Sequence, residues 1–445
     1  MSVEENSSMN RREFITAGAA AGATLMMPNI MRAAPVNNSN DLRIGIVGTG
    51  AEGQVLIDAA LKIPGIRFVA VCDIWEKWNR RRASRILQKF GHTVNEYLDY
   101  RDMLAKEKDL DGVIIATPDF WHHTHAIAFL EAGVHVYCEK EMSNNLANAR
   151  RMVQTARRTG KLLQIGHQRR SNPRYRHTHD YIIKEANLLG RLTTINAQWN
   201  RAVSADLGFP KKYPVPPEIL KRFGFKNMHQ FRNWRWYKGL GGGAIVDLGS
   251  HQIDIFSWFT GVNPSSVWAS GGTDYYEKKT HEWYDTVQTL WEYETAQGMV
   301  RAFYQTITTN SNQGYYESFM GDQATLTISE SASRGAAYRE AANPETPLWD
   351  KWVAKGYILP PSGSQQTQGT DVRETVPAEE YKINKTFDDP YHMPHLTNFF
   401  DAIRGNADLN CPGEIGYETA VAVLKVNDAV RTKQMQKFTK DEFHI

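Results

Sequence analysis

A short apolar run that leads straight into a glycine-rich turn constrains this chain more than any other feature. Residues 42–47 (LRIGIV) suit a buried parallel strand, and Gly48, Gly50 and Gly53 follow at once. In this spacing the first glycine allows a tight turn, the second lets the backbone approach a pyrophosphate, and the third lets a helix pack against the strand. The pattern predicts a strand, a turn and a helix whose free N–H groups bind the phosphates of a dinucleotide.

An acidic residue follows at the place where such a unit needs one. Residues 67–72 suit a second strand, and Asp73 stands directly after it, about 20 residues beyond the last glycine. A carboxylate there accepts hydrogen bonds from both hydroxyls of an adenosine ribose and repels a 2′-phosphate, so NAD is favoured over NADP. The arginines at positions 80, 81 and 82 keep NADP open, since one of them could bind a phosphate, although their spacing also fits a solvated helix face.

The alternation of strand-like and helix-like segments continues well past this point. Thr117 and Pro118 end one predicted strand, and Glu139 and Lys140 end the next. Because the carboxyl ends of parallel strands line the ligand crevice in such sheets, these four residues are candidates for the cofactor site.

The composition fits a soluble globular protein with a sizeable core. The 52 Lys and Arg residues nearly balance the 49 Asp and Glu residues, which leaves a formal charge of +3, so we expect no nucleic-acid partner. Hydrophobic residues make up 41% of the chain, which excludes disorder as its main state. There are only three cysteines, which argues against a disulfide framework.

The first 40 residues resemble an export signal. Arg11 and Arg12 precede an apolar run rich in Ala and Gly over residues 16–27, and small residues follow up to Ala34. This order is typical of a twin-arginine (Tat) signal, so we expect recognition by the Tat export machinery, cleavage near Ala34 and a periplasmic or exported protein. A membrane anchor is the alternative, but the run is shorter than the about 20 apolar residues that a bilayer requires, so we expect no membrane association after cleavage.

Several motifs, taken together, resemble those of one family. They are the glycine turn, Ala116-Thr117-Pro118 with His122, Gly133-Val134-His135-Val136 leading into Glu139-Lys140, and Gly241-Gly242-Gly243 followed by Asp247, Gly249, His251 and Asp254. After the leader, almost the whole chain resembles the Gfo/Idh/MocA family (glucose-fructose oxidoreductase, inositol dehydrogenase, MocA). The resemblance implies an α/β protein with an N-terminal Rossmann domain, here residues 41–165, whose sheet is parallel and doubly wound. It also implies a second α/β domain with an open, mostly antiparallel sheet, here residues 166–445, and hydride transfer between a nicotinamide and a sugar or cyclitol hydroxyl.

The resemblance also assigns residues to the cofactor, and one position departs from it. The assigned residues beyond the glycine turn and Asp73 are Thr117, Pro118, His122, Glu139 and Lys140. Relatives typically read Glu-Lys-Pro where this chain has Glu141 after Lys140. The loss of proline removes a fixed backbone angle beside the lysine, and Glu141, if it approached the ammonium, would favour its charged form.

A second group of polar residues lies on a predicted helix over residues 244–260, closed by Gly261. Asp247, His251 and Asp254 recur at i, i+4 and i+7, on a face that differs from the apolar stripe of this helix. A carboxylate one turn from an imidazole can fix its tautomer and stabilise its cationic form, as a general base requires.

By the resemblance, His251 is the acid/base and Lys140 is the cation that polarises the reacting oxygen. Asp247 is then the orienting partner of the histidine or an acceptor for a substrate hydroxyl. The alternative interpretation is structural: His251 forms a hydrogen bond in the domain interface, Asp247 caps nearby backbone and Lys140 is a surface lysine.

Candidate substrate residues come from the segments around this helix. They are Arg169, Trp236, Tyr237 and Asp254, because aromatic faces and guanidinium donors suit a sugar ring, although aromatic residues this dense also form cores. The sequence His122-His123-x-His125 contains residues of the kind that bind metals. Adjacent residues diverge by about 100° on a helix, so we expect no metal site.

The remainder of the chain is less informative. Residues 263–328 show strand-like alternation and are expected to form the large sheet. In residues 329–384, Pro, Gly, Gln and Ser accumulate, which predicts a long loop or a subunit-contact arm. We expect a homo-oligomer.

Three functions remain open. Because the Tat route carries folded proteins, the cofactor, NAD, would be taken up before export and held tightly. The favoured function is an NAD-dependent dehydrogenase that acts on a sugar or glycoside. The second is a glycosidase that oxidises, eliminates, hydrates and reduces its substrate, although the Thr-His-Gly-Leu-Gly stretch of the N-acetylgalactosaminidases in that branch is replaced here by Leu240-Gly241-Gly242-Gly243. The third is a non-catalytic sugar-binding protein, suggested by the residue after Lys140.

Overall fold

The computed structural model describes residues 40–331, 333–361 and 378–445. The predicted export signal, with its paired arginines, lies outside these ranges. Within them, no helix is both long enough and apolar enough to cross a bilayer.

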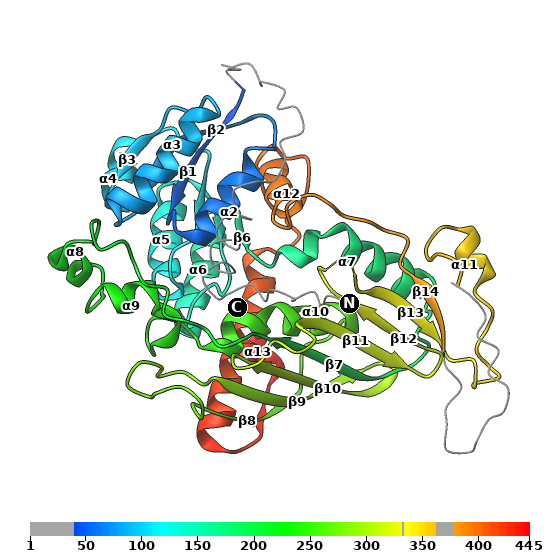
Figure 1. Ribbon diagram of the computed structural model, residues 1–445. Coiled ribbons are helices and arrows are strands. Elements are labelled where there is room, and N and C mark those ends of the chain that lie inside the picture. The colour runs from blue at the N-terminus through cyan, green and yellow to red at the C-terminus, as the bar shows by residue number, and fades with distance from the viewer. Residues whose placement is uncertain (1–39, 332, 362–377) are drawn as a thin grey trace, which may run out of the picture. The chain divides into compact units, whose positions relative to one another are not determined.

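A six-stranded parallel sheet forms the first half of the fold (Figure 1). Its strand order is β3-β2-β1-β4-β5-β6, the order of a doubly wound sheet, so the predicted Rossmann fold is confirmed. The strands are β1 (Leu42–Val47), β2 (Ile66–Cys72), β3 (Asn95–Tyr97), β4 (Gly112–Ile115), β5 (His135–Cys138) and β6 (Leu163–Ile165).

Apolar side chains project from both faces of this sheet, because successive residues of a strand point to opposite sides. In β4, Ile114 packs into one apolar cluster, while Val113 and Ile115 pack into the other. Helices cover both clusters: α2 (Ala51–Ala60), α3 (Arg81–Lys89), α4 (Tyr100–Lys106), α5 (Asp119–Glu131) and α6 (Leu146–Thr159).

Two helices from the end of the chain return to this sheet (Figure 1). They are α12 (Met393–Ile403) and α13 (Gly413–Thr432). The N–H of Ile165 in β6 donates to the carbonyl of Cys411 (3.0 Å), and the amide of Gln164 donates to the carbonyl of His395 (2.7 Å). These long-range bonds join the C-terminal segment to the edge of the parallel sheet.

A nine-stranded sheet forms the second half, in the order β14-β13-β12-β11-β7-β10-β9-β8-β15. All neighbours are antiparallel except β7 and β10, which confirms the open, mostly antiparallel sheet. The strands are β7 (Leu192–Asn200), β8 (Ser266–Gly272), β9 (Thr286–Thr295), β10 (Gly298–Ile307), β11 (Tyr315–Gly321), β12 (Ala324–Ile328), β13 (Gly335–Arg339), β14 (Glu379–Lys382) and β15 (Gln436–Lys437).

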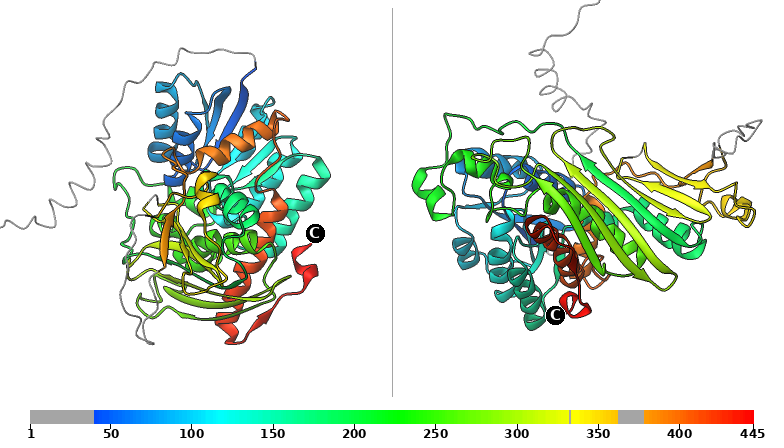
Figure 2. Two further views of the ribbon diagram at one scale, coloured as in Figure 1. Left: turned by 90° about the vertical axis from the view of Figure 1, so that its right-hand side faces the viewer. Right: turned by 90° about the horizontal axis from the view of Figure 1, so that it is seen from below.

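Helices cover one face of this sheet and leave the other open (Figure 2). On the covered face, Phe256 of α10 (Ser250–Thr260) packs in the same apolar cluster as Val287 and Trp291 of β9. On the open face, Trp268 and Leu290 are cross-strand partners, and 58% and 51% of their surfaces are exposed.

The structure corrects the prediction of a long loop over residues 329–384. Within the described part of this segment, β13 and β14 extend the sheet, and α11 (Asp350–Ala354) lies between them. The loop-forming residues are concentrated around 359–366, whereas Tyr381 alternates with charged neighbours and is buried, as on a strand. The composition of the whole segment concealed these two strands.

Candidate functional site

Two adjoining cavities lie where the parallel sheet meets the second sheet. The nucleotide cavity, of about 320 Å³, is lined by the glycine turn, Asp73 and the ends of β4 and β5. The polar cavity, of about 540 Å³, is lined by residues of both halves, including Lys140 and His251. Six residues line both cavities, so the two spaces are continuous: Glu52, Glu139, Lys140, Leu207, Arg232 and Arg235.

The glycine turn has the geometry that a pyrophosphate requires. Gly48 has φ +88°, and a Cβ there would lie 2.6 Å from the carbonyl oxygen of Ala116. A Cβ on Gly53 would lie 2.1 Å from the carbonyl oxygen of Gly48. No side chain caps the start of α2 at Gly50, where the nearest atom to an added Cβ is 3.8 Å away. The N–H groups of α2 are therefore free to bind phosphate, and the residues present fit a dinucleotide.

Asp73 fixes the turn from the end of β2. One carboxylate oxygen accepts the N–H of Trp75 (2.7 Å), and the other accepts the N–H of Thr49 (2.8 Å) and the amide of Asn79 (3.3 Å). Burial raises the pKa of Asp73, and these hydrogen bonds oppose the rise. The carboxyl group lines the nucleotide cavity, in position for the hydroxyls of a ribose.

The three arginines at positions 80, 81 and 82, which left NADP as an alternative cofactor, do not line the nucleotide cavity. Arg80 donates to the carbonyl oxygen of Asp73 (3.2 Å) and pairs with Glu96 (3.4 Å). Arg81 and Arg82 are exposed and line a separate surface groove. This arrangement agrees with NAD rather than NADP.

The other predicted cofactor residues lie at or behind the strand ends. Thr117 and Pro118 line the nucleotide cavity, as does Glu139. His122 is buried instead, with one ring nitrogen 2.6 Å from the carbonyl oxygen of Thr117 and the other 2.7 Å from that of Glu141. Its ring therefore joins the ends of β4 and β5 without reaching the cavity.

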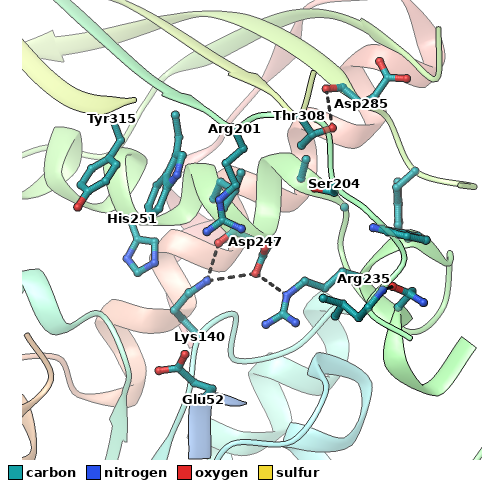
Figure 3. Close-up of a pocket in the computed structure, with 18 of the residues that line it drawn as sticks. Glu52, Lys140, Arg201, Ser204, Arg235, Asp247, His251, Asp285, Thr308 and Tyr315 are labelled. Carbon is teal, nitrogen blue, oxygen red and sulfur yellow. Dashed lines mark hydrogen bonds and ion pairs between the residues drawn. The ribbon is translucent and has the colours of Figure 1, made fainter. Parts of the chain in front are cut away.

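Lys140 occupies the junction of the two cavities. Its ammonium donates to the backbone carbonyl of Asp247 and lies 3.4 Å from the carboxylate of the same residue (Figure 3). Arg235 donates to the same carboxylate oxygen at 3.0 Å. Burial alone would raise the pKa of Asp247, but Arg235 and Lys140 outweigh it and hold that pKa well below its usual range. Asp247 is therefore ionised at neutral pH and balances the charge of Lys140.

His251 faces the same cavity from α10. Its ring lies 5.4 Å from that of Trp199 and 6.4 Å from that of His167, and Nδ1 has no hydrogen-bond partner among the described residues. Burial, together with the charges of Lys140 and Arg169, lowers the pKa of His251 well below its usual value. The imidazole is therefore neutral and able to accept a proton.

The structure does not pair Asp247 with His251. Residues Ile245–Gly249 form a π-helical turn, and α10 starts only at Ser250. The wider turn changes the angular relation that an α-helix gives to residues four apart, so Asp247 points to Lys140 and Arg235. The predicted end of the helix is confirmed, since Gly261 closes it with φ +74°.

Only one of the four predicted substrate residues lines the polar cavity. Trp236 does so and stacks on His281 at 3.8 Å. Tyr237 bonds His229 through its hydroxyl (2.9 Å). Arg169 and Asp254 do not line the cavity and lie instead in buried ion pairs: Arg169 with Glu317 and with Glu330, which itself lines the cavity, and Asp254 with Arg170.

Glu141, the departure from the usual proline, is almost completely buried. The Lys140–Glu141 peptide bond is cis. One carboxyl oxygen of Glu141 accepts the N–H of Met142 (2.8 Å). Burial raises the pKa of Glu141 to about 8, so the group is mostly neutral at pH 7 and adds little charge beside Lys140.

Three residues that line the polar cavity were not singled out from the sequence: Glu52, Arg201 and His392. Glu52 lies inside the glycine motif, which was the available signal, whereas the other two come from segments with no motif. Ligand atoms of Glu52, Glu139 and His392 lie within 4.8 Å of one another, which is the one metal-like grouping among the described residues. His122, His123 and His125, which are metal-ligand types in the sequence, are not part of this grouping.

Comparison with known proteins agrees with this architecture. Residues 42–167 match the model of an oxidoreductase family with an NAD-binding Rossmann fold, and residues 183–327 match the GFO/IDH/MocA C-terminal domain. The chain belongs to the Gfo/Idh/MocA family. Its N-terminal half is accordingly an NAD-binding Rossmann domain.

Relatives in the Gfo/Idh/MocA family carry different functional names. The rhizopine catabolism protein MocA of Rhizobium meliloti is 30% identical over 50% of this chain and 59% of its own length. The glycosyl hydrolase family 109 protein of Stenotrophomonas maltophilia is 30% identical over 57% of this chain and 56% of its own. The inositol 2-dehydrogenase of Rubrobacter xylanophilus is 25% identical over 77% and 86%. The chain spans about half the length of the first curated relatives it matches.

Solved structures of the Gfo/Idh/MocA family share the fold at low identity. Levoglucosan dehydrogenase in complex with NADH and L-sorbose has a TM-score of 0.66 and 18% identity, covering 90% of this chain and 99% of its own. The WlbA dehydrogenase of Bordetella pertussis, in complex with NADH and UDP-GlcNAcA, has a TM-score of 0.61 and 19% identity over the same shares.

Proposed function

We propose that this protein is an NAD-dependent oxidoreductase that transfers hydride between a hydroxyl-bearing carbon of a sugar or glycoside and the nicotinamide. One observation carries the proposal: Lys140 from the Rossmann domain and His251 from α10 line a single polar cavity that opens into the nucleotide cavity. An ammonium and a neutral imidazole beside one space are the groups that alcohol oxidation requires.

Each residue of the site has a separate role in the proposed reaction. NAD, held at the glycine turn and Asp73, supplies the hydride acceptor. The ammonium of Lys140 stabilises the negative charge that develops on the substrate oxygen as its proton leaves. The neutral ring of His251 accepts that proton. The backbone carbonyl of Asp247 holds Lys140 in place, and its carboxylate, fixed by Arg235, balances the charge of the ammonium.

A redox-cycling glycosidase is the second candidate. It is supported by the 30% identity to the glycosyl hydrolase family 109 protein, which covers 56% of that relative. The same Lys140 and His251 would serve transient oxidation, and the product rather than the site distinguishes the two functions.

Export and assembly remain part of the proposal. The paired Arg11 and Arg12 and the apolar run after them support transport by the Tat machinery to the periplasm. The exposed Trp268 and Leu290 lie side by side on the open face of the second sheet, and this contiguous apolar surface supports a homo-oligomer.

Purified protein tests the proposal directly. Mass spectrometry under gentle conditions is expected to detect bound NAD. Candidate sugars are then added while the reduced-nicotinamide absorbance band is followed and the products are analysed. A keto product supports the dehydrogenase, net hydrolysis without net reduction supports the glycosidase, and binding without either refutes both. His251→Ala is expected to abolish turnover and to leave NAD bound.

A further inference from the structure

Among the described residues, four Lys and Arg side chains line the polar cavity, and three of them form hydrogen bonds to neighbouring groups. Lys140 and Arg235 share the carboxylate of Asp247. Arg232 donates to the carbonyl oxygen of Gly208 at 2.8 Å. The fourth cation is the guanidinium of Arg201.

The backbone of Arg201 is hydrogen-bonded, whereas its guanidinium has no hydrogen-bond partner among the described residues. Its N–H donates to the carbonyl oxygen of Ile307 (2.8 Å), which extends the pairing of β7 and β10 by one residue. The guanidinium lies 5.2 Å from the ring of Trp199. Among the described residues, no carboxylate or carbonyl accepts a hydrogen bond from this side chain. Figure 3 shows it extending into the cavity toward Asp247.

The carboxylates on the second-sheet side of the cavity bind groups other than Arg201. One oxygen of Asp285 accepts three backbone N–H groups at 2.8 to 3.2 Å, while its buried Oδ1 has no hydrogen-bond partner among the described residues. Glu330 pairs with Arg169 (3.0 Å) and accepts a hydrogen bond from Gln168 (3.2 Å). Neither carboxylate pairs with Arg201. Its exposed guanidinium lines the polar cavity, where its charge acts on Asp247 and its donors remain free to bind a ligand.

Arg201 and the proposed acid/base flank the same aromatic ring. The ring of Trp199 stacks on Tyr315 (4.6 Å), and His251 lies 5.4 Å from it on α10. Arg201 also contributes to the low pKa of Asp247, which places its charge near the reacting centre. A sugar lying along Trp199 can therefore present a hydroxyl to His251 and a charged substituent to Arg201.

We propose that the substrate carries an anionic group, a carboxylate or a phosphate, which Arg201 binds through its planar donors. The substrate class is then acidic sugars, such as uronic acids or sugar phosphates, rather than neutral glycosides. This inference rests on the proposed function, because it names the substrate of the same cavity.

Matched substrates and variants test it. The wild type is compared on glucose, glucuronate and glucose 6-phosphate, with Arg201→Gln, Arg201→Lys and the control Arg301→Gln, whose side chain is exposed on β10 outside the cavity. Arg201→Gln is expected to raise KM for the acidic sugar about 10- to 100-fold, as a lost charged hydrogen bond does, and to lower the ratio of acidic to neutral kcat/KM by a similar factor. Arg201→Lys is expected to retain part of the preference, and Arg301→Gln all of it. Preference for glucuronate identifies a carboxylate, and preference for the phosphate identifies a phosphoryl group.

Binding measurements separate the two possible failures. Titration calorimetry of glucuronate and glucose 6-phosphate into the NAD-loaded protein gives a readout that does not depend on turnover. If acidic sugars bind through Arg201 but no sugar is oxidised, the proposed function fails and the anion site stands. If neutral sugars are oxidised as well as acidic ones, and Arg201→Gln leaves their ratio unchanged, the anion site is refuted and the function stands.

Discussion

Replacing Arg169 tests whether this residue stabilises the fold or binds substrate. Arg169 is 1% exposed and pairs with Glu317, which is fully buried, and with Glu330. Arg169→Met keeps much of the side-chain volume but leaves two buried carboxyl groups without their cation. Removal of one partner from a buried pair costs about 3–5 kcal/mol of unfolding free energy.

The expected effect is large enough for calorimetry. The unfolding entropy of a folded chain of roughly 400 residues is about 0.8 kcal/mol/K, so the loss lowers Tm by about 4–6 °C. In the double variant Arg169→Met/Glu317→Gln, part of this loss is expected to return, because one buried anion is gone. Arg301→Gln, on the surface, serves as the control. An unchanged Tm together with a raised KM for the sugar would refute the structural role and restore Arg169 as a substrate residue.

Three further predictions concern the nucleotide site and its surroundings. Gly53→Ala is expected to abolish NAD retention on purification, because the added Cβ would lie 2.1 Å from the carbonyl oxygen of Gly48; full retention would contradict the turn geometry. Asp73→Ser is expected to weaken NAD binding about 10- to 100-fold in a fluorescence titration, and an unchanged Kd would exclude the ribose contact. Burial raises the pKa of Glu141 to about 8 and also raises that of Glu139, so the folded NAD-free protein binds protons that the unfolded chain does not. The stability that these bound protons contribute is complete below pH 4.5, the ordinary pKa of a glutamate, and is lost as the pH rises through about 8. Tm is therefore expected to be higher at roughly pH 6 than at pH 9, and the difference is expected to be smaller in Glu141→Gln. A Tm that increases with pH would be incompatible with this assignment.

The nucleotide half of the protein could be predicted from the sequence because its determinants are local. Gly48 and Gly53 act through contacts inside one turn, and Asp73 follows its strand directly. The alternation of β-strands and helices then leaves few possible topologies. The same local reasoning placed Thr117 and Lys140 at the carboxyl edge of the sheet, where the structure has them.

The polar cavity was harder to predict because long-range partners and one irregular turn determine it. The i, i+4 relation of Asp247 and His251 assumed a regular α-helix, and the π-helical turn redirects the carboxylate. Arg169 is buried in an ion pair with Glu317, which lies far along the chain on β11. No local sequence pattern indicates that pairing. Arg201 lies just beyond the end of β7, in a segment without a motif.

The contact between Lys140 and the main chain of position 247 has a consequence for how this site tolerates mutation. The ammonium rests on a peptide oxygen as well as on the carboxylate, and every amino acid supplies that oxygen. Variation at position 247 therefore alters the charge beside the lysine more than its location. A homologue without the aspartate would still hold the lysine at the same place, and a single substitution at position 247 would restore the acidic partner.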